Sequence, residues 1–222
     1  MISAVLFDLD ETLIRRGPAI RAFVADQYAR FAEKLDGIDA GTYADTFLRL
    51  EDQGRVAKDV FYPTFVAALN IRGVDADTLL EDYRSRYPSF ATLSPGARET
   101  VAAVRADGLL TGVITNGNER VQKAKLAATG LHDLLDIIVV SEAVGMQKPE
   151  PTIFALTTSN LGVARDAALY VGDSPQVDII GAASAGMQTA WLRNGAAWPS
   201  GLPHKADADI DRLPEVLHFP GR

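Results

Sequence analysis

The sequence contains no cysteine, few histidines and no long hydrophobic run, and each absence excludes a class of protein. Without cysteine there are no disulfides, thiolate metal sites or cysteine nucleophiles, which fits a reducing cytoplasm. Only 3 histidines are present, His132, His204 and His218, so a histidine-rich zinc site is not expected. No apolar stretch approaches the roughly 20 residues that span a bilayer, and strand-like sequence follows Met1 where a signal peptide would lie. We therefore expect a cytoplasmic protein with no membrane partner.

Acidic residues outnumber basic ones. The chain has 29 Asp and Glu against 22 Lys and Arg, which gives a net charge of −7. Binding to nucleic acid needs a basic footprint, so a nucleic-acid partner is not expected. Hydrophobic residues make up 47% of the 222 residues, enough to bury the core of one large domain or two modest ones.

Short apolar runs alternate with helical patterns over most of the chain. The runs are rich in β-branched residues and end in polar ones, which is typical of strands buried on both faces. We expect strands at 4–7, 109–114, 137–140, 169–171 and 189–192, and a short edge strand at 208–210. Helices are expected between them, over about 95–107, 118–129, 151–161 and 177–186. This alternation predicts an α/β fold with an open, Rossmann-like parallel sheet.

Residues 16–92 have a different pattern. Apolar residues recur there at helical spacing, among them Phe23, Phe47, Val60 and Tyr83, and no alternating strand pattern is present. The sequence therefore predicts an all-helical domain of residues 16–92, inserted into a catalytic core of residues 1–15 and 93–222.

Polar side chains follow the predicted strands at their carboxyl ends, where ligands bind in open α/β sheets. These residues are Asp8 and Asp10, Thr115 and Asn116, Lys148, and Asp173 and Asp178. Two carboxylates about 4 Å apart repel by about 1 kcal/mol in water and about 4 kcal/mol at an effective dielectric constant of 20. One lysine cannot neutralise four carboxylates, whereas a divalent cation can. The all-oxygen donor set favours a hard ion, Mg²⁺ above others.

Four segments around these residues resemble the motifs of the haloacid dehalogenase superfamily. They are FDLDETL at 7–13, ITNGN at 114–118, QKPEP at 147–151 and VGDSPQVD at 171–178, in the order of that family's motifs I to IV. The helical insertion after the first motif is similar to the cap of a phosphatase-like subfamily. The resemblance thus implies a Rossmann-like core whose helical cap closes over the substrate.

The resemblance also implies catalytic roles. Asp8 is the expected nucleophile, which forms an aspartyl-phosphate, and Asp10 the general acid and base. Thr115 and Lys148 are expected to take part in catalysis, and both are expected to bind the phosphoryl group together with Asn116.

A metal site follows from the same resemblance. Asp8, the carbonyl of Asp10 and Asp173 are expected to bind Mg²⁺. Asp178 is expected behind these ligands, where it holds Lys148 or a metal-bound water.

The function implied is an Mg²⁺-dependent phosphatase for a small phosphorylated metabolite, as a monomer or homodimer. Glu11 departs from the pattern, because such phosphatases often have glycine there. One alternative is a dehalogenase, which Asp10 disfavours since a leaving halide needs no proton. Another is a phosphate-binding protein that has lost turnover. Candidates for substrate contacts, in the helical domain or directly before it, are Arg15, Arg16, Arg55, Lys58, Phe61 and Tyr62.

Overall fold

The computed structural model describes residues 1–35, 37–203 and 206–220, so His204 lies outside the described residues. The chain divides into two compact units. One comprises Met1–Arg15 and Thr92–Arg222, and the other comprises Arg16–Ala91. Among the described residues, no helix has both the length and the apolar character needed to cross a bilayer.

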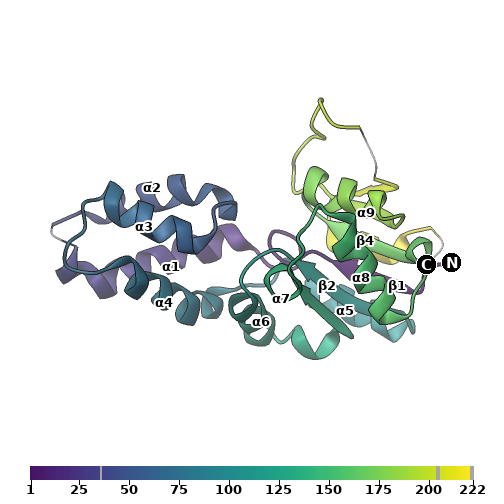
Figure 1. Cartoon of the computed structure of the whole chain (residues 1–222). Helices are drawn as coiled ribbons and strands as arrows, with labels where there is room; N and C mark the ends of the chain where they lie inside the picture. Colours follow the sequence, from purple (N-terminus) through teal and green to yellow (C-terminus); the bar gives the residue numbers. More distant parts are fainter. Residues whose placement is uncertain (36, 204–205, 221–222) are drawn as a thin grey trace. The chain divides into compact units, whose positions relative to one another are not determined.

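The first unit is built on a 6-stranded parallel sheet with the strand order β3-β2-β1-β4-β5-β6 (Figure 1). The strands are β1 (Ala4–Phe7), β2 (Leu110–Thr115), β3 (Ile137–Val140), β4 (Ala168–Gly172), β5 (Gln188–Leu192) and β6 (Ala208–Ile210). Every residue of β1 is buried, as expected for a central strand covered on both faces. The predicted Rossmann-like α/β fold is confirmed. Because β1 pairs with β2 and β4, the carboxyl ends of these three strands lie side by side.

Helices connect the strands. They are α5 (Ala97–Ala106), α6 (Glu119–Ala128), α7 (Ser141–Val144), α8 (Pro151–Leu161) and α9 (Gly181–Ser184), with short helical segments η4 (His132–Leu134), η5 (Arg165–Ala167), η6 (Pro175–Ile180) and η7 (Leu213–His218). The side chain of Asn118 caps α6 by accepting a hydrogen bond from the backbone of Val121. Pro151 opens α8, and Gly162 ends it with a positive φ.

The single helix predicted over 177–186 is wrong in detail. The segment η6 is a π-helix that opens after Ser174, and the α-helical geometry begins only at Gly181. The backbone N–H of Ser174 donates to Asp178 Oδ2 at 2.9 Å, so the side chain of Asp178 is folded back toward the end of β4. Wide turns of this kind are frequent at functional sites.

The second unit is all-helical. It contains α1 (Arg16–Phe31), η1 (Ala32–Lys34), α2 (Ala40–Glu51), η2 (Asp52–Gly54), α3 (Lys58–Ala68), α4 (Ala76–Arg86) and η3 (Tyr87–Phe90). Aromatic rings fill its core, with Phe47 in edge-to-face contact with Phe61 and Phe65. Val60 is 60% exposed, contrary to the helical-spacing prediction, because the rings at Phe61 and Phe65 define the inward face of α3.

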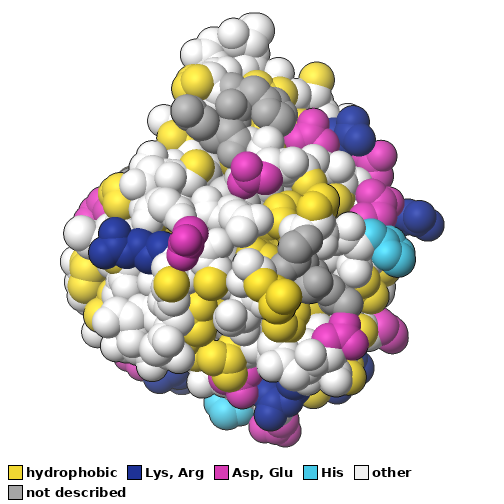
Figure 2. All heavy atoms as spheres, turned by 90° about the vertical axis from the view of Figure 1, so that its right-hand side faces the viewer, with side chains coloured by type: hydrophobic (Ala, Val, Ile, Leu, Met, Phe, Trp, Pro, Cys, Tyr) yellow, Lys and Arg dark blue, Asp and Glu magenta, His cyan; other side chains and the backbone are white. Residues whose placement is uncertain are grey.

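Charged side chains of both signs are distributed over the face drawn in Figure 2, and hydrophobic side chains lie among them. Such a mixed surface differs from the basic footprint of a nucleic-acid-binding protein. The expectation that this chain binds no nucleic acid stays a prediction.

Candidate active site

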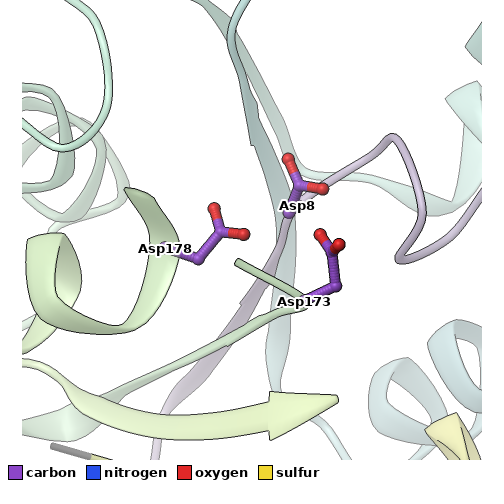
Figure 3. Close-up of side chains that lie close together, drawn as sticks. All are labelled: Asp8, Asp173 and Asp178. Carbon is purple, nitrogen blue, oxygen red and sulfur yellow. The ribbon is translucent and has the colours of Figure 1, made fainter. Parts of the chain in front are cut away.

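Three carboxylates meet at the carboxyl ends of the central strands. Asp8 directly follows β1, Asp173 follows β4, and Asp178 lies in η6. One oxygen of each lies within 4.8 Å of the other two. Figure 3 shows the carboxylate of Asp178 reaching from its helix toward the other two acids. The structure therefore brings together acids that are 165 residues apart in the sequence (173 − 8).

Lys148 lies against this cluster from the loop that precedes α8. Its Nζ donates to Asp8 Oδ1 at 2.6 Å, to Asp178 Oδ1 at 2.7 Å and to the hydroxyl of Tyr170 at 2.9 Å. Burial by itself would lower the pKa of Lys148, but the charges of Asp178 and Asp8 outweigh it and raise that pKa well above its usual range. The contacts with the two carboxylates therefore favour the charged ammonium form of Lys148.

The cluster carries more negative charge than Lys148 can balance. Burial raises the pKa of Asp8 from 3.8 to about 7, and the charge of Asp178 adds to the effect of burial while Lys148 opposes it. Burial and the charges of Asp8 and Asp178 raise the pKa of Asp173 from 3.8 to about 8. A divalent cation would offset this repulsion, and three carboxylates without nitrogen or sulfur donors suit a hard ion. The donor set thus fits a divalent metal ion, which Asp8 and Asp173 would hold.

Neighbouring residues fix the positions of these acids. At Gly172, a Cβ would lie 2.5 Å from the Cβ and Cγ of Asp178, so only glycine lets this side chain approach the strand. The indole N–H of Trp191 donates to the backbone carbonyl of Asp173 at 2.8 Å. Neither Trp191 nor Tyr170 was singled out from the sequence, because an aromatic ring in a strand usually signals only packing.

Motif II supplies a hydroxyl and an amide beside the lysine loop. The side chain of Asn116 accepts a hydrogen bond from the backbone N–H of Lys148 and donates to the Lys148 carbonyl, both at 2.9 Å. This side chain is therefore used to hold the lysine loop. Thr115 is buried at the end of β2, and its Oγ1 accepts a 2.6 Å hydrogen bond from Gln122 Nε2.

The carboxylate of Asp10 is not one of the three that lie within 4.8 Å of one another, although its charge contributes to the raised pKa of Asp8. The chain leaves the extended conformation after Asp8, since the N–H of Ile14 returns to the carbonyl of Leu9 and Glu11 has a φ of 64°. The carboxylate of Asp10 consequently turns toward α6. There, Lys125 Nζ donates to both of its oxygens at 2.8 Å.

Sequence reasoning missed the polar face of α6. The spacing of the apolar residues in this segment would turn Val121, Ala124 and Ala128 inward, but only Val121 is buried, while Ala124 is half-buried and Ala128 is exposed. The buried positions include Gln122 and Lys125, each 3% exposed. Their spacing of three residues, just after motif II, is the signal that could have revealed them.

The candidates for substrate contacts differ in their surroundings, and all but Arg15 lie in the second unit. The rings of Phe61 and Tyr62 are buried in its aromatic core. The side chains of Arg16 and Lys58 both form ion pairs with the buried carboxylate of Glu51. Arg15 and Arg55 are exposed, and Arg55 pairs with Asp52.

Comparisons with protein families, curated proteins and solved structures all find hydrolases. The family model described as haloacid dehalogenase-like hydrolase matches residues 2–186. The chain is 30% identical to a ribulose-1,5-bisphosphate 5-phosphatase of Halopiger xanaduensis, over 97% of this chain and 98% of that protein. A solved HAD phosphatase from Thermococcus onnurineus is 31% identical, with a TM-score of 0.75 and coverage of 99% and 98%. A solved 2-haloacid dehalogenase from Pseudomonas syringae is 30% identical, with a TM-score of 0.69 and coverage of 98% and 97%.

Proposed function

Because the chain belongs to the haloacid dehalogenase-like hydrolases, we propose that it is a phosphatase that uses Mg²⁺ and hydrolyses small phosphorylated metabolites. The observation that carries this proposal is the contact of buried Lys148 with buried Asp8 in a cluster of three acids. The name of the Halopiger relative, a sugar-phosphate phosphatase, supports the same class of substrate.

In the proposed reaction, a carboxylate oxygen of Asp8 attacks phosphorus, and the bond from phosphorus to the leaving oxygen breaks. Asp10 enters this step protonated and gives its proton to that oxygen, so the alcohol leaves neutral and the resulting carboxylate forms the ion pair with Lys125. Asp10 then takes a proton from water, which attacks the aspartyl-phosphate and releases inorganic phosphate and free Asp8. Lys148 balances charge on the phosphoryl oxygens, and the hydroxyl of Thr115 and the backbone of Asn116 orient them.

Asp8, the backbone carbonyl of Asp10 and Asp173 are the proposed ligands of Mg²⁺. When bound, the ion would supply positive charge against the oxygens of the phosphoryl group and lower the pKa values of the neighbouring acids. Asp178 is assigned a positioning role, because its Oδ1 accepts a hydrogen bond from the ammonium of Lys148.

Phosphate-ester hydrolysis is preferred to dehalogenation because of Asp10. An alkoxide needs a proton to leave, whereas a halide leaves as a stable anion. Dehalogenation therefore requires no second carboxylate as a general acid. The 2-haloacid dehalogenase among the relatives makes dehalogenation the alternative to test. We further propose that the helical unit of residues 16–91 acts as the cap that selects the substrate. A cytoplasmic location and a monomeric or homodimeric state stay predictions.

Replacement of the nucleophile tests this function. Asp8→Asn should abolish turnover of p-nitrophenyl phosphate while the circular dichroism spectrum and melting temperature show a folded protein. Asp133→Asn is the matched control, because the side chain of Asp133 is 93% exposed and lies in the same unit. EDTA should remove the wild-type activity and Mg²⁺ should restore it. More than a few per cent residual activity in Asp8→Asn, or halide release from 2-haloacids without phosphatase activity, would contradict the proposal.

A further inference from the structure

The acid proposed to move protons, Asp10, is held by two buried side chains of one helix. Lys125 Nζ donates to Oδ1 and to Oδ2 of Asp10, both at 2.8 Å. Gln122 Nε2 donates to Oδ2 at 3.0 Å. Lys125 and Gln122 lie one helical turn apart on α6 and are each 3% exposed, so packing fixes their positions as well.

The same amide group also contacts motif II. Gln122 Nε2 lies 2.6 Å from Thr115 Oγ1 and 3.2 Å from the carbonyl oxygen of Asn116. A single side chain thus bridges the carboxylate of Asp10 and the end of β2, where the phosphoryl group is proposed to bind. Rotation of Asp10 would break hydrogen bonds at both of its oxygens.

Stability alone explains this arrangement poorly. Removing a lysine from water is costly, and replacing a buried ion pair by apolar residues of similar size is often neutral or stabilising. An apolar side chain could occupy position 125 on the buried face of α6, just as the fully buried Leu126 occupies the next position. A buried ammonium aimed at one carboxylate does what an apolar residue cannot, because it fixes the direction of that carboxylate.

We propose that Lys125, assisted by Gln122, is a positioning residue that holds the carboxylate of Asp10 in line with the leaving oxygen and with the attacking water. This inference rests on the proposed phosphatase function and deepens it. Proton transfer by a positioned side chain contributes about 100- to 10,000-fold to a rate. We call the contacts of Lys125 and Gln122 with Asp10 the clamp. Loss of the clamp should reduce the rate by part of this factor, and only in steps that need proton transfer by Asp10.

The dependence of the rate on the leaving group separates this role from a structural one. A p-nitrophenolate leaves almost without a proton, whereas the alkoxide of an alkyl phosphate requires one. In Lys125→Met, kcat/KM for an alkyl phosphate should therefore fall by about 10- to 100-fold, while kcat/KM for p-nitrophenyl phosphate changes only slightly. Hydrolysis of the aspartyl-phosphate also needs Asp10, so kcat and KM for p-nitrophenyl phosphate should fall together and a burst of p-nitrophenolate should appear.

Two further variants and one control complete the test. Lys125→Arg keeps a cation with paired donors and should recover most of the alkyl phosphatase activity. Gln122→Met keeps the ion pair and should give a smaller loss of the same kind, which provides the measurement if Lys125→Met does not fold. Lys123→Met is the matched control, since Lys123 lies on the same helix but is exposed and pairs with Glu119. It should leave all rates unchanged.

The possible outcomes differ for the two proposals. If wild-type protein hydrolyses no phosphate ester, the proposed function fails and this inference fails with it. If the wild-type protein is active but Lys125→Met loses the same factor for every leaving group, without a burst, Lys125 has only a structural role. Unchanged rates in Lys125→Met and Gln122→Met would likewise overturn the inference and leave the phosphatase function intact.

Discussion

Replacing Asp173 by asparagine should stabilise the protein in the absence of metal, although it removes a proposed metal ligand. Without a cation, burial and the charges of Asp8 and Asp178 raise the pKa of Asp173 from 3.8 to about 8. At about 1.4 kcal/mol per pH unit, this difference corresponds to an ionisation cost on the order of 6 kcal/mol in the folded protein above pH 8. Asparagine removes the charge but is still desolvated, so we expect a gain of about 2–3 kcal/mol in the free energy of unfolding.

The pH dependence of this gain has a definite sign. The pKa values of Asp8 and Asp173 are higher in the folded protein than the ordinary value of 3.8, so the folded state binds more protons than the unfolded state. Metal-free wild-type protein should therefore lose stability as the pH rises from about 4 through 7 to 8. Asp173→Asn should show a weaker loss, and its advantage should disappear near pH 4.

Urea unfolding followed by circular dichroism measures this effect. In EDTA at pH 8, Asp173→Asn should unfold at a higher urea concentration than wild type. At an Mg²⁺ concentration of about 1,000 times the dissociation constant the order should reverse, because the ion then stabilises the state that binds it by about 4.1 kcal/mol, which exceeds the gain from the substitution. A variant that is less stable than wild type in EDTA, or equal stabilisation of both proteins by Mg²⁺, would refute the reasoning and remove Asp173 from the metal site.

Two other substitutions test the surroundings of the cluster. Tyr170→Phe removes the hydroxyl that accepts a hydrogen bond from Lys148, so we expect about 1–2 kcal/mol lower stability in thermal unfolding and a kcat reduced by about tenfold; an unchanged kcat would mean that Lys148 is positioned by its acid partners alone. Glu11→Gly relieves a left-handed backbone conformation with a φ of 64° and should raise the stability by about 0.5–1 kcal/mol in urea. A loss of stability there would show that the Glu11 side chain contributes more than its conformation costs.

Much of the catalytic core could be predicted from the sequence because strands buried on both faces leave a strong local signal. The runs at Ala4–Phe7 and Ile137–Val140 form strands with the predicted bounds, and β2 differs from its predicted bounds by one residue at each end. The rule that ligands bind at carboxyl ends then placed Asp8 and Asp173 together without any knowledge of the structure. The π-helical geometry of Pro175–Ile180 could not be predicted, because it depends on the side chain of Asp178 reaching back to the strand.

The clamp on Asp10 was missed for a different physical reason. Periodicity assigns the buried face of a helix to its apolar residues, since a buried charge is costly on its own. The burial of Lys125 is tolerated because the carboxylate of Asp10 balances its charge. Asp10 lies 115 residues away in the sequence, so no local pattern contains this pairing.

The helical unit has a second case of the same kind. Glu51 is 2% exposed at the end of α2, where amphipathic spacing would expose a glutamate. Its carboxylate pairs with Arg16, 35 residues away, and with Lys58. Both cations were candidates for substrate contacts, yet each already balances a buried acid in its own unit. A substitution at Glu51 would leave two partly buried cations without this partner and would destabilise the helical unit. A loss of activity in such a variant would therefore not by itself show a change in substrate binding. Variants of Arg16 or Lys58 therefore need a stability measurement before any change in KM is assigned to recognition.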